Sequence, residues 1–287
     1  MYSEPLYRPP SEAHSAILQA TVGCSHNRCA FCDMYKIKKF TILNEETLTK
    51  HALEVAKCFP KAQKVFVADG NALVMPFDNW IKLLKNIKKL FPFCQRVSTY
   101  ATPTDILRKS EDELFTLRKN GLTLLYMGIE SGSDAILDYI DKGVSSKELV
   151  LAGKKAIAAG INLSVTVIAG LGGEDYSDHA IATAKVISEI QPHFVGVLSL
   201  MPEPNTKIYD DVQKGNFKLP STIHVLKEIQ LLLANVNLQN TIFRSNHASN
   251  YLSLAGTLNR DRKALMKIID HAIANPEILR PEYNRGL

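Results

Sequence analysis

The sequence predicts an α/β fold in which a parallel sheet closes, fully or nearly, into a barrel. Apolar runs rich in β-branched residues alternate with segments of helical periodicity along most of the chain. The 287 residues are 46% hydrophobic and 22% charged, which is enough apolar material for a large core. Such alternation joins parallel strands through right-handed crossovers. A doubly wound open sheet is the main alternative architecture.

Six apolar runs predict the strands. They are Ala16–Val22, Lys64–Ala68, Arg96–Tyr100, Thr123–Ile129, Ile161–Gly170 and Phe194–Leu200. Short runs that stay apolar are typical of strands buried on both faces, as in parallel sheets. A seventh strand is predicted at Thr241–Arg244.

Helical periodicity predicts the segments between the strands. The predicted helices are Glu45–Cys58, Phe77–Leu90, Glu111–Asn120, Ser146–Ala159, Tyr176–Ile190, Ser221–Asn235 and Arg260–Ala274. Asn44, Ser110 and Ser146 are candidate N-caps, whereas Gly121 and Gly160 stand just past helical segments, where a left-handed residue is common. We expect residues 1–215 to form the barrel core and residues 216–287 a C-terminal extension that packs on or completes the barrel.

Charge and hydropathy limit which partners and which location we expect for the protein. The first residues lack the charged and apolar regions of a signal peptide and no apolar run is long enough to span a bilayer, which predicts a cytoplasmic protein without a membrane partner. The net charge of +5 permits a nucleic-acid partner without requiring one. The most basic stretch, Lys82–Lys89, has helical spacing, which favours a solvated helix face over an RNA-binding patch.

Three of the five cysteines form a loop with the spacing C-x4-C-x2-C at Cys24, Cys29 and Cys32. Such a loop can place three thiolates on three corners of a cubane iron–sulfur cluster and leave the fourth iron open for a small ligand. Zinc held by the three cysteines and a histidine such as His26 is the alternative. Cys58 and Cys94 stand alone, and we expect them to be buried small residues.

Polar and glycine residues follow the predicted strands at one end. They are Asp69, Gly70 and Asn71 after the second strand, Tyr100 at the end of the third, Glu130 and Ser131 after the fourth, Gly170 to Glu174 after the fifth, and Met201 after the sixth. In parallel α/β folds, the carboxyl ends of the strands form the active face. The sequence therefore predicts one cleft lined by these residues and the cysteine loop.

In these motifs the sequence resembles the radical S-adenosylmethionine superfamily over about the first two-thirds of the chain. The resemblance implies a partial (β/α)6 TIM-like barrel with one 4Fe–4S cluster on Cys24, Cys29 and Cys32, which would be both metal ligands and catalytic residues. Two departures stand out. The usual spacing C-x3-C-x2-C has one added residue, and Asp69-Gly70-Asn71 replaces the family's Gly-Gly-Glu.

The resemblance also implies contacts to S-adenosylmethionine. Phe31 would lie against adenine, and Asp69, Gly70 and Asn71 would hold the methionine amino group. Glu130, followed by Ser131, would contact the ribose hydroxyls, whereas Gly170, Gly172 and Met201 would pack on adenine. Apart from the resemblance, we expect Tyr100 to face the cleft and the cofactor, and a strand residue that fills the barrel is the alternative. The structural alternatives are a helix cap for Glu130 and a tight turn for the glycines.

A segment after the seventh strand supplies the substrate candidates, Arg244, Asn246, His247 and Asn250. It is dense in hydrogen-bonding side chains and could cover the barrel mouth. A capped helix start with a satisfied histidine explains the same residues equally well.

The implied reaction is reductive cleavage of S-adenosylmethionine, after which the 5′-deoxyadenosyl radical abstracts hydrogen from a substrate. It requires a flavodoxin- or ferredoxin-type reductant. Cys58 and Cys94 are too few for a second cluster, which argues against relatives that carry one. We expect a small-molecule or cofactor-biosynthesis substrate, with RNA modification as the alternative among enzymes and a zinc-stabilised, non-redox binding protein as the alternative outside them.

Overall fold

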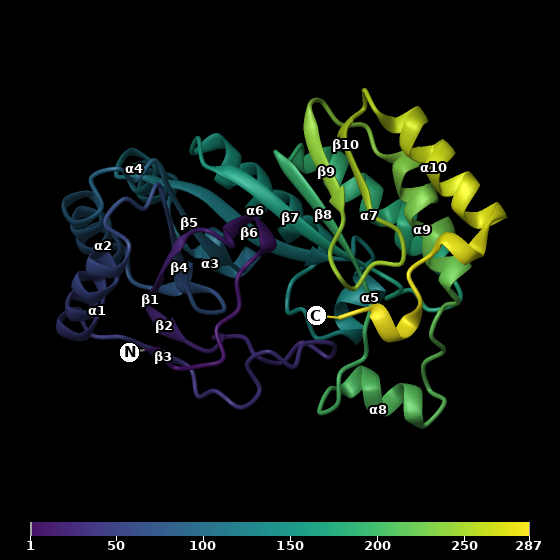
Figure 1. Cartoon of the computed structure of the whole chain (residues 1–287), viewed down its shortest axis with the longest axis horizontal. Coiled ribbons are helices and arrows are strands. Elements are labelled where there is room, and N and C mark those ends of the chain that lie inside the picture. The colour runs from purple at the N-terminus through teal and green to yellow at the C-terminus, as the bar shows by residue number, and fades with distance from the viewer. Residues whose placement is uncertain (1, 287) are drawn as a thin grey trace. The chain divides into compact units, whose positions relative to one another are not determined.

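The computed structural model describes residues 2–286 and has the predicted α/β fold (Figure 1). The main sheet has eight strands in the order β1-β4-β5-β6-β7-β8-β9-β10. The strands therefore follow one another in chain order, without the reversal that defines a doubly wound sheet, which favours the barrel class over the alternative. The internal contacts divide the chain into two compact units.

Unit 1 comprises residues 1–27, 34–127 and 155–163. Its strands β1 (Ala16–Gln19), β4 (Lys64–Ala68), β5 (Arg96–Ala101) and the first part of β6 (Leu122–Glu130) pair in parallel, with Phe66 between Ile17 and Ser98. A small antiparallel ribbon pairs β2 (Thr21–Val22) with β3 (Thr41–Ile42). The helices of this unit are α1 (Glu45–Cys58), α2 (Phe77–Leu90), α3 (Pro103–Arg108) and α4 (Glu111–Lys119), with 3-10 turns at Pro10–Glu12 and Ala72–Val74.

Unit 2 comprises residues 28–33, 128–154 and 164–287. Strands β7 (Asn162–Ala169), β8 (Phe194–Ser199) and β9 (Thr241–Ser245) run parallel, and β10 (Leu254–Leu258) runs antiparallel to β9. Its helices are α5 (Asp134–Tyr139), α6 (Ser146–Ala158), α7 (Tyr176–Ile190), α8 (Lys207–Gln213), α9 (Thr222–Asn235) and α10 (Arg262–Ala274), with 3-10 turns at Pro276–Ile278 and Glu282–Asn284. α9 contacts both α7 and α10, and α10 contacts β10 (Figure 1).

The sequence predicted most elements to within a few residues, including β9 in the expected C-terminal extension, where Ile242 pairs with Phe194 of β8. One strand prediction was wrong, and two strands, β3 and β10, were not predicted. Ala16–Val22 is not one strand, because β1 ends at Gln19 and β2 pairs with β3 instead. β10 was not predicted, because its sequence LAGTL is short and neither uniformly apolar nor alternating. The boundary at residues 215 and 216 stays a prediction.

The predicted caps are confirmed at two of three helices. Asn44 accepts a hydrogen bond from the backbone N–H of Thr47, and Ser110 accepts one from Glu113 at 3.0 Å. Ser146 is instead the first residue of α6, and the hydroxyl of Ser145 accepts from the N–H of Glu148 at 3.3 Å, one residue earlier than predicted.

The surface expectations are met only in part. The lysines at 82, 85, 88 and 89 of α2 are exposed, while Leu83, Leu84 and Ile87 on the opposite face are buried. Cys58 and Cys94 are not buried as predicted: Cys58 is exposed at the end of α1, and Cys94 is half-buried with its thiol donating to the carbonyl of Arg96 at 3.4 Å. Among residues 2–286, no helix combines the length and the apolar character that a membrane crossing needs.

Candidate active site

In unit 1, the start of the cysteine loop lies directly on the end of β4. The N–H of Gly70 donates to the carbonyl of Gly23 at 3.1 Å. A Cβ atom on Gly70 would lie only 2.8 Å from the Cβ of Cys24 and 3.0 Å from the carbonyl oxygen of Gly23. Position 70 therefore has no room for a side chain, and the structure brings together two motifs that the sequence predicted to converge.

Asp69 is fully buried behind this contact and anchors it. Its Oδ2 accepts from the ammonium of Lys38 at 2.8 Å, the N–H of Gly23 at 3.2 Å and the amide of Gln19 at 3.3 Å. The Lys38 side chain is itself only 4% exposed, so the two charges neutralise each other in the interior. The other oxygen, Oδ1, is buried without a hydrogen-bond partner within residues 2–286. One acceptor at the end of β4 is therefore left for a further donor.

Asn71 ties the cysteine loop to the next strand connection. Its Oδ1 accepts from the N–H of Ser25 at 2.9 Å, and its Nδ2 donates to the Ser25 hydroxyl at 2.7 Å and to Asp105 at 2.9 Å. Burial raises the pKa of Asp105, and the hydrogen bond from Asn71 opposes that shift. Both hydrogens of the Asn71 amide are used inside the protein, so this side chain positions the loop.

The second half of the loop belongs to unit 2. The N–H of Cys32 donates to the carbonyl of Cys29 at 3.3 Å, which makes a tight turn, and Phe31 within it is half-buried. Buried Ala30 fixes the turn, because its N–H donates to the carbonyl of Ile140 at 2.8 Å and its carbonyl accepts from Ile208 at 3.0 Å. The ends of α5 and α8 thus hold the segment that carries Cys29 and Cys32.

The donor set suits a soft metal centre. Cys24, Cys29 and Cys32 are partly exposed thiols outside disulfides, and thiolates are the ligands that iron–sulfur clusters use. Within residues 2–286, no three His, Cys, Asp or Glu side chains are grouped as a ready-made metal site. The ligand role of the three cysteines stays a prediction.

The end of β6 in unit 2 carries the predicted acid in a constrained conformation. Glu130 has a φ of 59°, in the left-handed region, and its carboxylate folds back over Gly128, where a Cβ would lie 2.0 Å from Oε1. Lys142 pairs with Oε1 at 2.9 Å, and both side chains are about one-tenth exposed. Glu130 does not cap α5, contrary to the structural alternative. Ser131 is fully buried and accepts from the N–H of Ser133 at 3.0 Å.

The glycine turn after β7 is held from behind by two buried side chains. The N–H of Gly170, which has a φ of 100°, donates to Glu228 of α9 at 2.8 Å. The other oxygen of Glu228 lies 2.8 Å from the Nδ1 of His179 in α7. A Cβ on Gly172 would lie 3.0 Å from the Cβ of His179, so the turn packs closely on α7. His179 and Glu228 could not be recognised from the sequence, because both lie within ordinary helical patterns.

A cavity of about 270 Å³ opens beside this turn in unit 2. It is lined by Gly170, Leu200, Pro202, Leu219, Pro220, Ser221, Thr222, Val225, Tyr251, Glu282 and Arg285. It adjoins the fifth- and sixth-strand segments predicted to pack on adenine, and Met201, half-buried, lies between two of its lining residues.

Arg285 closes one side of the cavity and was not predicted. Its guanidinium donates to the carbonyl of Leu200 at 2.9 Å and to that of Ser249 at 2.7 Å, and it lies 4.1 Å from the ring centre of Tyr251. The side chain is 3% exposed. A contact across 85 residues of sequence leaves no local signal that could have revealed it.

The four substrate candidates divide into two pairs. Asn250 is 2% exposed, donates to the carbonyl of Val197 at 2.8 Å and accepts from Ser199 at 2.9 Å, so it anchors the loop. His247 is half-buried beside Ser249 at 2.9 Å, and burial, aided by the charge of Arg280, lowers its pKa. Arg244 and Asn246 are exposed.

Tyr100 lies among aromatic rings of unit 1. It is half-buried and makes edge contacts with Phe66 at 5.2 Å and Tyr126 at 6.0 Å between ring centres. The strand register pairs Tyr100 with Tyr126, so the two share one face of the sheet. A role of Tyr100 toward a cofactor stays a prediction.

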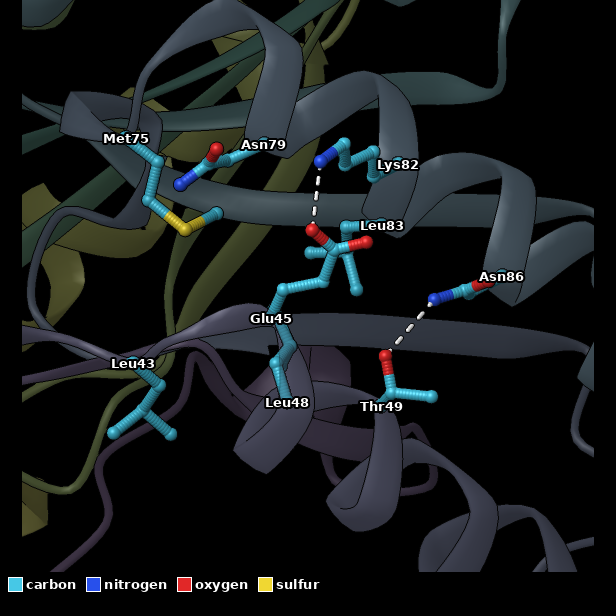
Figure 2. Close-up of a pocket in the computed structure, with 9 residues that line it drawn as sticks. All are labelled: Leu43, Glu45, Leu48, Thr49, Met75, Asn79, Lys82, Leu83 and Asn86. Carbon is cyan, nitrogen blue, oxygen red and sulfur yellow. Dashed lines mark hydrogen bonds and ion pairs between the residues drawn. The ribbon is translucent and has the colours of Figure 1, made fainter.

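A second, much smaller hollow in unit 1 lies between α1 and α2 (Figure 2). Its volume of about 20 Å³ is enough for about one water molecule. The Glu45 and Lys82 ion pair at 2.6 Å and the hydrogen bond from Asn86 to Thr49 at 3.4 Å link the two helices across it (Figure 2). This hollow is a feature of helix packing and is too small for a substrate.

Comparison with known proteins agrees with this fold and these motifs. Residues 18–184 match the model of the radical SAM superfamily, which is more than half of the chain. The chain therefore belongs to the radical SAM superfamily, a family of enzymes whose members use a 4Fe–4S cluster and S-adenosylmethionine.

Individual relatives share low sequence identity with the chain or match only a short part of it. The heme chaperone HemW of Bacillus subtilis is 24% identical over 207 residues, which cover 69% of this chain and 53% of that protein. A tRNA-2-methylthio-N(6)-dimethylallyladenosine synthase of Sulfurihydrogenibium is 35% identical over 88 residues, covering 30% and 20%. The chain spans about half the length of the HemW relatives that it matches.

Solved structures show the same fold. Coproporphyrinogen III oxidase (HemN) from Escherichia coli superposes with a TM-score of 0.57 at 18% identity, covering 77% of this chain and 51% of that chain. Methylornithine synthase (PylB) superposes with a TM-score of 0.56 at 15% identity, covering 89% and 68%.

Proposed function

We propose that this protein binds one 4Fe–4S cluster through Cys24, Cys29 and Cys32 and reductively cleaves S-adenosylmethionine to abstract hydrogen from a small-molecule or cofactor-biosynthesis substrate. The observation that carries the proposal is the seating of Cys24 on Gly70, with the vacant acceptor of Asp69 behind it. The cysteine loop and a buried oxygen without a donor among residues 2–286 thus belong to neighbouring residues at the end of β4, and an amino group would supply such a donor.

The cluster, when bound, would supply one electron to the sulfonium of S-adenosylmethionine and so release the 5′-deoxyadenosyl radical. The residues of the chain bind and orient. Asp69 would accept from the methionine amino group through Oδ1, with help from the backbone of Gly70. Asn71 would hold the loop through Ser25. This division of roles follows from the hydrogen bonds already made by Asp69 and Asn71.

The unit 2 residues would bind the nucleoside. One oxygen of Glu130 pairs with Lys142, and the other is available to accept from a ribose hydroxyl, with Ser131 beside it. Phe31 and Met201 would pack on adenine, and Gly170 and Gly172 would let the flat base approach the backbone. Glu228 and His179 would keep that glycine turn in place.

The electron would come from a flavodoxin- or ferredoxin-type protein. The experiment is anaerobic reconstitution of the chain with iron and sulfide, followed by reduction with dithionite and measurement of 5′-deoxyadenosine. We expect production by the parent and by the matched variant Cys58→Ala, whose thiol is exposed outside the loop, and none by Cys29→Ala. Equal production by Cys29→Ala and the parent, or a colourless protein that holds zinc, would reject the proposal.

A second candidate is haem binding, because two relatives named heme chaperone match about 70% of the chain. Titration of the protein with hemin would test it through a saturable shift of the Soret band. A spectrum that stays that of free hemin would exclude this function.

A further inference from the structure

Arg244 lies in a row of small residues on one face of the unit 2 sheet. The register pairs Arg244 of β9 with Gly196 of β8 on one side and with Ala255 of β10 on the other. Gly196 in turn pairs with Thr166 of β7. Paired residues point to the same face, so the row presents one long charged side chain between two positions with little or no side chain.

This face is opposite to the one that packs on α10. The alternate residues Val195, Val197 and Phe243 are buried toward the helices, and a Cβ on Gly256, which pairs with Phe243, would lie 3.2 Å from Leu265 of α10. On the opposite face Arg244 and Ala255 are exposed. A Cβ on Gly196 would have no neighbour closer than 3.9 Å. The sheet face is therefore open at position 196, next to the backbone position of Arg244.

The guanidinium is oriented but not neutralised. Its Nη1 donates to the carbonyl of Phe243 at 2.8 Å and to that of Gly256 at 3.4 Å, which holds the group over the sheet. Within residues 2–286, no carboxylate pairs with it and its Nε and Nη2 have no acceptor. Of the six arginines of unit 2, Arg28, Arg260 and Arg285 pair with an acid, whereas Arg262 and Arg280 are half-buried and donate to backbone carbonyls. Arg244 differs from these five in being exposed, without an acidic partner among residues 2–286, and in offering two adjacent donors.

We propose that Arg244 binds an anionic group of the substrate, a carboxylate or a phosphate, on this face of the unit 2 sheet. Two parallel N–H groups of a guanidinium match the paired oxygens of either anion, which makes arginine suited to this recognition. The assignment rests on the proposed function, since it names the substrate class of the same enzyme. It predicts a substrate with at least one negative charge.

The test follows the arginine Nε–H signals in proton–nitrogen NMR spectra of the reconstituted full chain without reductant. Inorganic phosphate and acetate are titrated separately at constant ionic strength, so that the two anion sources are distinguished. The Arg244 signal is assigned as the one missing in Arg244→Gln. Arg260→Gln is the matched control, because Arg260 is an exposed arginine of the same unit that is already paired with Asp261.

We expect the Arg244 signal to shift saturably with at least one anion. The affinity derived from this shift should be about tenfold or more above the affinity derived from any shift of the Arg260 signal. In Gly196→Asp, a carboxylate beside Arg244 should weaken anion binding by a similar factor, and Arg260→Gln should leave it unchanged. An Arg244 signal that responds to neither anion, or only as Arg260 does, would overturn the assignment. Anion binding is measured without S-adenosylmethionine, so failure of the cleavage assay alone would count against the proposed function and not against this site.

Discussion

The end of β4 in unit 1 and the strand β9 in unit 2 carry polar residues that look alike in sequence but differ in how they are used. Asp69 and Asn71 are buried, and most of their hydrogen-bonding groups are paired with the protein. Arg244 and Asn246 are exposed, and the charge of Arg244 has no acidic partner among residues 2–286. Polar residues at strand ends thus serve either to build the loop or to meet a ligand, and only the structure separates the two uses.

The largest expected effect lies at Asp69. Asp69→Ala would leave the ammonium of Lys38 buried without its counter-charge, which costs about 3–5 kcal/mol in the free energy of unfolding. Urea unfolding of the cluster-free protein would measure it. The exposed ion pair of Glu45 and Lys82 provides the control, since Lys82→Met should cause no measurable loss. If Asp69→Ala were as stable as the parent, the end of β4 would not be structural and the comparison would fail.

Gly70→Ala should have the next largest effect, because the new Cβ would press on Cys24 at 2.8 Å. We expect a loss of about 1–3 kcal/mol in the free energy of unfolding, together with lower iron content after reconstitution. Gly286→Ala is the matched control, because apart from the chain neighbours of Gly286 no heavy atom of residues 2–286 lies within 4 Å of the new Cβ. Unchanged stability and iron content in Gly70→Ala would show that the loop can move away from β4.

Acid should weaken unit 1 through His51, whose Nε2 accepts from the N–H of Gln19 at 3.2 Å. Burial lowers the pKa of His51 below its unfolded value of about 6.5. Between these two pKa values the unfolded chain binds more protons than the folded protein. His51 therefore makes its whole contribution to the free energy of unfolding above about pH 6.5, and this contribution is lost as the pH falls through the folded pKa.

His51→Gln, which keeps an acceptor, should flatten this dependence by at most about 1.4 kcal/mol per pH unit. Urea titrations between pH 7 and pH 5 would measure the slope. The exposed His14 gives the control variant His14→Gln, and an identical slope in His51→Gln and the parent would contradict the assignment.

The smallest expected effect on stability is at Arg244. Arg244→Gln should change the free energy of unfolding by no more than about 0.5 kcal/mol, because the side chain is exposed and forms no ion pair with residues 2–286. Urea unfolding of Arg244→Gln and Asp69→Ala, measured side by side, would therefore compare the end of β4 with β9 most directly. A large loss in Arg244→Gln would show that β9 depends on this side chain and would remove the distinction between the two regions.

The sequence predicted well what local chemistry determines. Helical periodicity placed α1, α2 and α7 at their observed bounds, and strand runs followed by glycine placed the turn at Gly170. The contact between Gly70 and the cysteine loop followed from the rule that the carboxyl ends of parallel strands meet.

What the sequence did not predict depends on contacts between distant segments. Glu228 reaches Gly170 across 58 residues, and Arg285 reaches Leu200 across 85. Neither residue has a neighbour in sequence that indicates its role. A buried acid such as Glu228, on a helix, resembles any polar helical position until its partner is known, and the same holds for a basic residue such as Arg285. One carboxylate oxygen of Asp69 anchors the loop, whereas the other has no hydrogen-bond partner within residues 2–286. This difference can be seen only from the atomic positions.

The position of Arg285 also bears on the order in which unit 2 is completed during synthesis. A ribosome adds residues from the amino end at about 5–20 per second, so β8 and the segment around Ser249 emerge well before Arg285. Until then, the carbonyl oxygens of Leu200 and Ser249 lack this donor and the ring of Tyr251 lacks its cation. The wall that Arg285 gives the cavity therefore forms only after β8 and the segment around Ser249 have been made.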